Sequence, residues 1–441
     1  MPYFIHALMA EKVSSFLLVC YCENELPPCG EIGVSSRMIV YVAPSMIGGP
    51  CWRSMIGPLL IFDKSFLQML NPEEVSELSL HFKFVGTPTL IGEIIADLKL
   101  EPSKRRLPSE VVQALSRKMQ KAHGLLPANY RKLALANIYA HEIPMIGQVP
   151  VDGAAPNVRV TEDRRGLLYD STPEQILWNR WANGEFSTED ELTATTWRNG
   201  IDQIDLDGLA ALWKNFSLRH FSSTRNQDEL ASALDVFLRD SAPSVQREIL
   251  NMTLDLMKAS AQHRRVAHAL MNIGEMRSVL EFAPYAASVL RLFLAFVCGL
   301  ARGFIGPRPT NYIDLQYLYY SPFCMVFVSN DKFHREMWGA TSGVHSFVWG
   351  KDLKEDLRGR ITMRAQMKES TGGVANKEDT ADAAVTPPSV IAKMWGTHMR
   401  VRDKPDQPER ARTFENLAPE IQQQFKNAMK EFDKIDRAQK R

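Results

Sequence analysis

Two short apolar runs, far apart in the sequence, each lead into acidic residues. The first is residues 58–62 (PLLIF), followed by Asp63, and the second is residues 325–328 (MVFV), followed by Ser329-Asn330-Asp331. Short, continuous apolar runs are typical of strands that are buried on both faces of a parallel sheet. Because the carboxyl ends of such strands meet at one edge, where open α/β sheets place their sites, we expect these acids to lie near one another.

Two further strands and two further acids fit the same sheet. Residues 82–85 and 345–349 are predicted to be strands, and Thr87-Pro88 has the composition of a helix start. That helix carries Glu93 away from its apolar face, and Asp314 lies in an aromatic run with helical character. The predicted fold class is therefore α/β, with a parallel sheet flanked by helices.

The order of the four acids resembles that of the PIN-domain nucleases. An Asp follows the first strand, a Glu lies in the helix after the second, an Asp lies in a later helix, and a polar residue with an Asp ends the next strand. Residues 57–98 and 311–350 carry this resemblance. It implies a PIN-like sheet whose catalytic acids are Asp63, Glu93, Asp314 and Asp331.

The resemblance also implies a divalent metal ion, Mg²⁺ or Mn²⁺, as the cofactor. Hard cations prefer oxygen ligands, and carboxylates that converge without a cation repel one another. For any single acid, the alternative role is that of a helix cap or turn former. The implied metal ligands are Asp63, Asp314 and Asp331, and the implied supporting residues are Ser329 and Asn330.

Basic side chains supply the candidate contacts with a substrate phosphate. Lys64, Lys332 and His334 lie beside the acids in the sequence, and exposed surface is the alternative role for each. Residues 101–142 hold eight basic and three acidic side chains, which would either follow a nucleic-acid backbone or form a solvated helix face. The predicted partner is nucleic acid, and the resemblance favours RNA over DNA.

A long segment separates the two halves of the acidic pattern, since 220 residues lie between Glu93 and Asp314. We expect it to form a large, mostly α-helical insertion that splits the PIN-like domain. The C-terminal segment has an apolar stripe at helical spacing and is a candidate surface for a protein partner. The predicted divisions are residues 1–54 as a poorly ordered extension, 55–100 plus 285–365 as the PIN-like domain, 101–284 as the insertion, 366–412 as a linker and 413–441 as an amphipathic helix.

Composition restricts the location of the protein and the kinds of contact it makes. The net charge of +1 gives no global nucleic-acid signature, so a nucleic-acid surface would be local. Four of the six cysteines lie in the first 51 residues without zinc-ligand spacing, and Cys298 and Cys324 lie in apolar runs. These features favour a reducing, cytoplasmic environment. No apolar run reaches the roughly 20 residues of a membrane span, so no membrane contact is predicted.

These patterns lead to two functional hypotheses. The first is a metal-dependent phosphodiesterase, a nuclease and most simply a ribonuclease, whose acidic quartet binds the metal and activates water. The alternative is a non-catalytic, helical module that binds nucleic acid or protein, in which the acids have structural roles.

Overall fold

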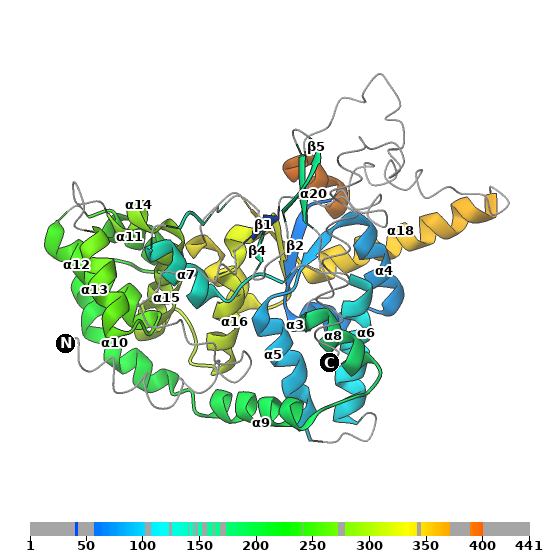
Figure 1. The fold of residues 1–441 in the computed structure, drawn as a ribbon, viewed down its shortest axis with the longest axis horizontal. Coiled ribbons are helices and arrows are strands. Elements are labelled where there is room, and N and C mark those ends of the chain that lie inside the picture. Colours follow the sequence, from blue (N-terminus) through cyan, green and yellow to red (C-terminus); the bar gives the residue numbers. More distant parts are fainter. Residues whose placement is uncertain are drawn as a thin grey trace.

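The four predicted strands form one parallel sheet in the computed structural model. The order is β3-β2-β7-β8, so β2, the first of these four strands in the chain, lies inside the sheet, and helices flank the sheet (Figure 1). The prediction of an α/β fold with a parallel sheet flanked by helices is confirmed. The strands are β2 (Leu59–Phe62), β3 (Lys83–Val85), β7 (Val326–Ser329) and β8 (Ser346–Trp349).

The structure describes residues 57–370 with short gaps, together with residues 40–42 and 389–399. The gaps are residues 102–106, 123–125, 140, 144, 146–148, 152–156, 162–163, 168–172, 241, 272–277 and 342–344. The predicted C-terminal helix at 413–441 lies outside the described residues, as does the predicted extension at 1–54 apart from residues 40–42.

Strand register brings the polar strand ends together. Phe62 of β2 is paired with Val328 of β7, so the residues that follow them, Asp63 and Ser329, lie side by side. All four residues of β2 are at most 2% exposed, as expected for a strand covered on both faces. The sheet therefore delivers two of the predicted site residues to the same edge.

Side-chain caps begin the helices next to the first two strands of the sheet, including the predicted start at Thr87. The Asn71 side chain accepts a hydrogen bond from the backbone N–H of Glu74, and the Glu74 side chain accepts one from the backbone N–H of Asn71. Thr87 caps the following helix in the same manner through Leu90 N–H. These helices are α3 (Lys64–Met69), α4 (Pro72–His81), α5 (Pro88–Ala96) and the 3-10 turn η2 (Asp97–Lys99).

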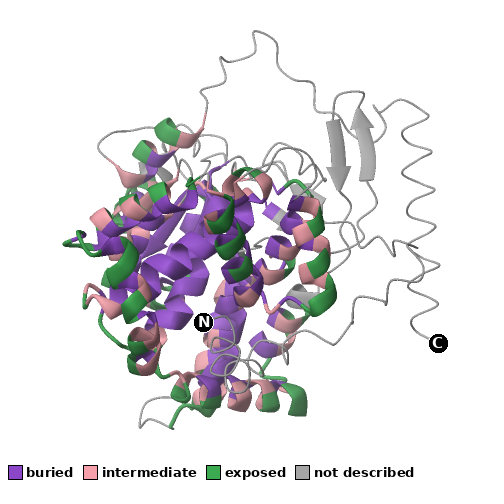
Figure 2. Ribbon diagram, turned by 90° about the vertical axis from the view of Figure 1, so that its left-hand side faces the viewer, coloured by how far each residue is buried: buried purple, intermediate pink, exposed green. Residues whose placement is uncertain are grey.

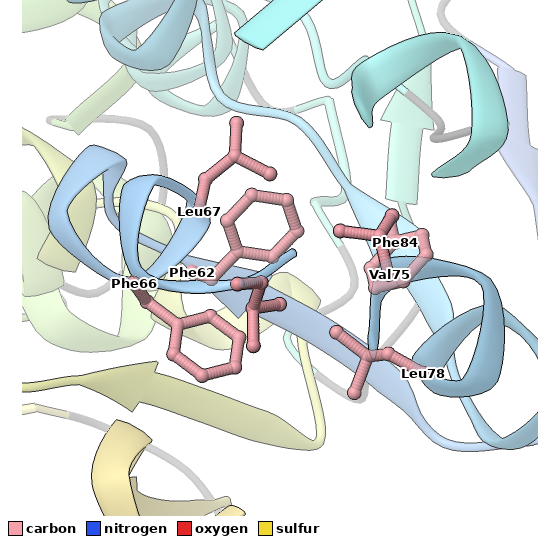
Figure 3. Close-up of a pocket in the computed structure, with 7 residues that line it drawn as sticks. Phe62, Phe66, Leu67, Val75, Leu78 and Phe84 are labelled. Carbon is pink, nitrogen blue, oxygen red and sulfur yellow. The ribbon is translucent and has the colours of Figure 1, made fainter. Parts of the chain in front are cut away.

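An apolar layer fills the space between the sheet and the first two helices. Figure 3 shows Phe62, Phe66, Val75, Leu78 and Phe84 facing one another there. Their packing leaves no room for a water molecule. This layer therefore has no room for a polar ligand.

The segment between β3 and β7 is mostly helical. Helices α10 to α14 gather to one side of the sheet, whereas α6 and α8 lie on the other (Figure 1). The helices of this segment up to α14 are α6 (Pro108–Ala122), α7 (Tyr130–Ile138), α8 (Pro173–Ala182), α9 (Thr188–Asp202), α10 (Leu206–Phe221), α11 (Gln227–Leu238), α12 (Pro243–Leu256), α13 (Ala261–Met271) and α14 (Val279–Phe282).

Helix α15 (Pro284–Ala301) is the core helix of this helical side. It packs against α7, α10, α11, α12 and α14 and also against α16. Its residues 285–300 are buried, and Figure 2 shows the buried interior of the protein in purple. Its one charged side chain, Arg291, forms an ion pair with Asp235 and donates to the backbone carbonyls of Ala340 and Thr341. Among the described helices, α15 alone is long and apolar enough to cross a membrane, and 89% of it is buried inside the protein.

The second acidic stretch and the end of the described chain form the remaining helices. Helix α18 is tied to α4 by ion pairs that join Glu74 to Arg358 and Lys354, and Glu77 to Arg364. It extends away from the body of the protein (Figure 1). The elements are α16 (Thr310–Leu318), η3 (Ser321–Phe323), α17 (Lys332–Met337), η4 (Trp338–Ala340), α18 (Gly350–Ser370) and α20 (Val390–His398).

Helix α20 corrects the prediction of a linker at 366–412. The helix begins after Ser389, which caps it, and buries Ile391 and Met394. It packs against α18, and Trp395 donates to the backbone carbonyl of His81. The polar composition around it concealed two apolar positions three residues apart, which are enough to dock one short helix.

Two small antiparallel pairs complete the described elements. β1 pairs with β4, and β5 pairs with β6. The first pair links a piece of the predicted N-terminal extension to the middle of the chain. The strands are β1 (Val40–Val42), β4 (Val149–Val151), β5 (Asn157–Thr161) and β6 (Arg164–Leu167).

Candidate active site

The Asp63 carboxylate lies at the end of β2 and is held on both of its oxygens. Its Oδ1 accepts from the Ser65 hydroxyl and from the backbone N–H of Phe66, each at 2.8 Å. Its Oδ2 accepts from the Ser329 hydroxyl at 2.5 Å and lies 3.5 Å from Nδ1 of His334. Asp63 thus caps α3, as the alternative structural role predicted, and has little capacity left for a metal ion.

Ser329 connects three parts of the site through one hydroxyl group. It donates to Asp63 and accepts from the backbone N–H of Asp331 at 2.9 Å. Its oxygen also lies 2.8 Å from Nδ1 of His334. Because Ser329 is fully buried, no water replaces these contacts. The prediction of Ser329 as a residue that supports the carboxylates agrees with this geometry.

His334 is the buried positive charge of the site. Burial lowers its pKa, but the hydrogen bond with Asp63 and the charges of Asp314 and Asp63 outweigh burial and raise the pKa to about 9. Its Nε2 donates to the backbone carbonyl of Asp314 at 3.0 Å. In return, burial raises the pKa of Asp63, but His334 and Ser329 hold it below its ordinary value. Asp63 and His334 therefore form an ion pair in the interior.

Asp314 has the opposite environment. It lies in α16, is only 9% exposed, and its Oδ2 accepts no hydrogen bond from the described residues. Burial raises its pKa to about 7, and the negative charges of Glu93, Asp331 and Asp63 add to this shift against the positive charge of His334. A carboxylate in such a place gains from any cation that reaches it.

Glu93 approaches Asp314 from α5. Burial raises its pKa, and the charges of Asp63 and Asp97 raise it further, against Lys64 and Tyr317. The Tyr317 hydroxyl donates to its Oε2. Tyr317 lies three residues after Asp314 on the same helix, so the spacing in the sequence already places the two side chains on one face.

Asp331 lies at the rim of the site. Its Oδ1 accepts from the backbone N–H of Phe333 at 2.8 Å, so it caps α17. Its Oδ2 lies 3.5 Å from Nη2 of Arg308, which is also 3.9 Å from Oδ2 of Asp314. The structure thus brings the four predicted acids to one edge of the sheet. Arg308 lies between the outer pair, Asp314 and Asp331. Sequence reasoning missed Arg308.

The other predicted site residues lie nearby with different contacts. Asn330 accepts from the backbone N–H of Lys351 and donates to Met69, so it supports the junction of β7, α3 and α18. Lys64 binds Asp97 at 2.9 Å, and Arg198 binds the same carboxylate at 3.1 Å.

Two of the predicted phosphate contacts do not fit the structure as it stands. His334 is fully buried, and both its ring nitrogens have partners, so it offers a phosphate nothing. Lys64 is engaged with Asp97. Lys332 is 85% exposed on its side chain and pairs with Glu336 on the outer face of α17, so it remains accessible to solvent.

The basic segment of residues 101–142 is partly structural. Arg117 donates to the backbone carbonyl of Ala182, and Lys118 donates to that of Leu67. Arg131 donates to the hydroxyl of Tyr130 and lies over its ring. Arg117 and Lys118 therefore tie α6 to α8 and α3, and Arg131 packs on its neighbour in α7. These contacts leave less positive charge for a nucleic-acid surface than the sequence predicted.

A divalent ion fits the outer pair of carboxylates better than the full quartet. Within the part of the chain that the structure describes, no three His, Cys, Asp or Glu side chains form a group that could hold a metal ion. Mg²⁺ is commonly held by one or two carboxylates and keeps several waters, however. Asp314 and Asp331 both direct an oxygen toward Arg308, and the Oδ2 of Asp314 lacks a hydrogen bond. This pair fits such an ion.

Comparisons of the chain with protein-family models, with curated proteins and with solved structures give no match. The fold and the site describe the protein as an α/β protein with buried carboxylates at the carboxyl edge of a parallel sheet.

Proposed function

We propose that the protein is a metal-dependent phosphodiesterase that cleaves nucleic acid, with RNA as the favoured substrate. The observation that supports this most strongly is the buried Asp314 carboxylate, which lies among three other acids and accepts no hydrogen bond from the described residues on Oδ2. A site with this excess of negative charge is completed by a cation. The preference for RNA rests on the resemblance to PIN-domain nucleases.

Asp314 and Asp331 would hold Mg²⁺ or Mn²⁺. When bound, the ion would offset negative charge on the phosphate and lower the pKa of water. Asp63 would not bind the ion but would position the site, because its contacts with Ser329 and His334 fix the positions of β7 and α17. This assignment gives the first acid of the resemblance a positioning role rather than that of a ligand.

Glu93 is the proposed proton acceptor. A water oxygen would attack phosphorus while its proton passes to the carboxylate, the phosphorus–oxygen bond to the leaving alcohol would break, and the leaving oxygen would take a proton from solvent. Tyr317 occupies Oε2, so Oε1 is the oxygen that would receive the proton. Burial raises the pKa of Glu93 above its ordinary value, which makes its carboxylate a stronger proton acceptor.

The architecture we propose is a PIN-like unit that is split by the helical segment. Helix α15 contacts both α16 and the helical side, so the two parts share one core. That arrangement would let the helical segment form one wall of the substrate path without interrupting the sheet.

A second candidate is a non-catalytic module that binds nucleic acid or protein. It is supported by the hydrogen bonds that both oxygens of Asp63 accept, and by the helix caps that Asp63 and Asp331 form. These contacts give both acids a structural role. In such a module the ion pair between Asp63 and His334 would stabilise the fold, and the site would have no need of a metal.

A cleavage assay separates the two candidates. Labelled single-stranded RNA is incubated with the protein in Mn²⁺, in Mg²⁺ or in a chelator, and the products are resolved by length. The proposed function predicts cleavage only with metal, lost in the double variant Asp314→Asn/Asp331→Asn. The control Asp352→Asn/Glu355→Gln removes two exposed acids of α18 and should leave cleavage unchanged. RNA that is bound but stays intact under all conditions would favour the binding module.

A further inference from the structure

Arg308 lies in the connection between α15 and α16, across the outer two acids of the site. Its Nη2 is 3.5 Å from Oδ2 of Asp331 and 3.9 Å from Oδ2 of Asp314. These are ion-pair distances and not well-formed hydrogen bonds. One guanidinium nitrogen thus occupies the position between the two carboxylates where a cation would serve both.

The backbone on either side of Arg308 is held more firmly than its guanidinium. Asn311 donates from Nδ2 to the carbonyl of Gly306 at 2.9 Å and from its backbone N–H to the carbonyl of Arg308 at 2.8 Å. Nε of Arg308 donates to the hydroxyl of Thr310 at 2.5 Å. The side chain itself is 62% exposed. Exposed ion pairs of this kind contribute little. The guanidinium can therefore turn from the carboxylates at the cost of one exposed hydrogen bond, from Nε to Thr310, while the hydrogen bonds of Asn311 keep the loop in place.

Other cations near the acids are committed elsewhere. Lys64 pairs with Asp97, and His334 is buried with both nitrogens bonded. Lys332 pairs with Glu336 on the outer face. Arg308 therefore stands apart among the described basic residues near the site, because it is both exposed and in contact with the carboxylates.

We propose that Arg308 is the residue that binds the substrate's phosphate, and that it exchanges between two partners. Without metal its guanidinium neutralises Asp314 and Asp331. When a divalent ion takes its place, the guanidinium turns to a phosphodiester group of the nucleic-acid backbone. This inference rests on the proposed function. A guanidinium suits the task because its fork of donors matches two phosphate oxygens at once and needs no base sequence.

The exchange predicts effects of opposite sign from one substitution. In Arg308→Gln, Mn²⁺ no longer competes with a guanidinium, so its dissociation constant should fall by roughly two- to fivefold, the range expected for an exposed ion pair. The affinity for RNA in the presence of Mn²⁺ should fall by roughly tenfold, the loss expected for a charged hydrogen bond. Damage to the fold would instead weaken both interactions.

Two measurements on the full chain test this prediction. Electron paramagnetic resonance counts free Mn²⁺ during a titration of the protein with Mn²⁺ alone. Fluorescence anisotropy follows binding of a labelled phosphorothioate oligoribonucleotide, which resists cleavage. Arg308→Lys keeps the charge and should lie between the wild type and Arg308→Gln in both measurements. Arg219→Gln removes an equal charge from the exposed last turn of α10, outside the site, and should change neither.

Each outcome decides the inference. Tighter Mn²⁺ together with weaker RNA in Arg308→Gln supports it. Equal Mn²⁺ binding in the wild type and the variant, or weaker binding in the variant, overturns the exchange while the proposed function stands. Unchanged RNA affinity overturns the phosphate contact. If neither protein binds Mn²⁺, the exchange and the proposed function both fail.

Discussion

The hydroxyl of Ser329 is the most informative single group to remove from the site. In Ser329→Ala, Asp63 keeps its two donors on Oδ1, and His334 keeps its 3.5 Å contact with Asp63. The backbone N–H of Asp331 loses the hydroxyl that it bonds, and Oδ2 of Asp63 and Nδ1 of His334 lose their contacts with the same oxygen. A donor left without its partner in a buried site costs about 1–3 kcal/mol. The backbone N–H of Asp331 is such a donor, whereas Asp63 and His334 still pair with each other. We therefore expect a loss of stability near the middle of this range, about 2 kcal/mol.

Ser321→Ala is the matched control for this substitution. Ser321 is as buried as Ser329, but its hydroxyl has no hydrogen-bond partner among the described residues. Removal of a hydroxyl that bonds nothing should leave stability within about 0.5 kcal/mol of the wild type or raise it. The two variants therefore differ only in whether the deleted oxygen organises other groups.

Urea unfolding followed by tryptophan fluorescence measures both variants. The midpoint for Ser329→Ala should fall while the slope stays unchanged, and the midpoint for Ser321→Ala should not fall. If the two variants lose the same stability, or if Ser329→Ala loses none, then Ser329 does not hold the site together and the geometry argued for Asp63 and His334 is wrong.

Two further predictions concern packing and acid stability. A Cβ at Gly92 would lie 2.2 Å from the ring of Trp197, so Gly92→Ala should cost about 1–3 kcal/mol, whereas Gly359→Ala, on a helix face with nothing within 4 Å, should not destabilise; thermal melting distinguishes them. Burial raises the pKa of Glu77, but hydrogen bonds, including one from Arg364, outweigh it and hold the pKa below the ordinary 4.5. Glu77 therefore stabilises the fold above pH 4.5, and the stabilisation is lost as the pH falls through the lower, folded pKa. Urea midpoints measured as the pH is lowered from 4.5 should show a shrinking difference in stability between the wild type and Glu77→Gln. A difference that stays constant with pH would contradict this.

Much of the fold follows from local sequence signals. The continuous apolar run of β2 and the caps at Asn71 and Thr87 are encoded within a few residues, so strands and helix starts could be predicted there. Helix α20 was missed because only Ile391 and Met394 mark its buried face within a polar stretch. Docking of so short a helix depends on a surface built by residues far away in the chain.

The site could be predicted only in outline. Strand ends in a parallel sheet meet by topology, which is why Asp63 and Ser329 were expected to lie close together. The burial of His334 and the reach of Arg308 depend on how the helical side packs against the sheet, and no local pattern encodes that. The same limit explains why His334 was assigned to a phosphate when it is in fact the counter-ion of Asp63.

The proposed function depends on a divalent cation bound by Asp314 and Asp331. The most direct measurement is the melting temperature of the wild type and of Asp314→Asn/Asp331→Asn as Mn²⁺ is added. A ligand that binds only the folded state adds about 2.7 kcal/mol of stability at 100 times its dissociation constant. If Asp314 and Asp331 hold the ion, the melting temperature should rise with Mn²⁺ in the wild type and stay constant in the double variant. An equal rise in both proteins, or no rise in either, would contradict it.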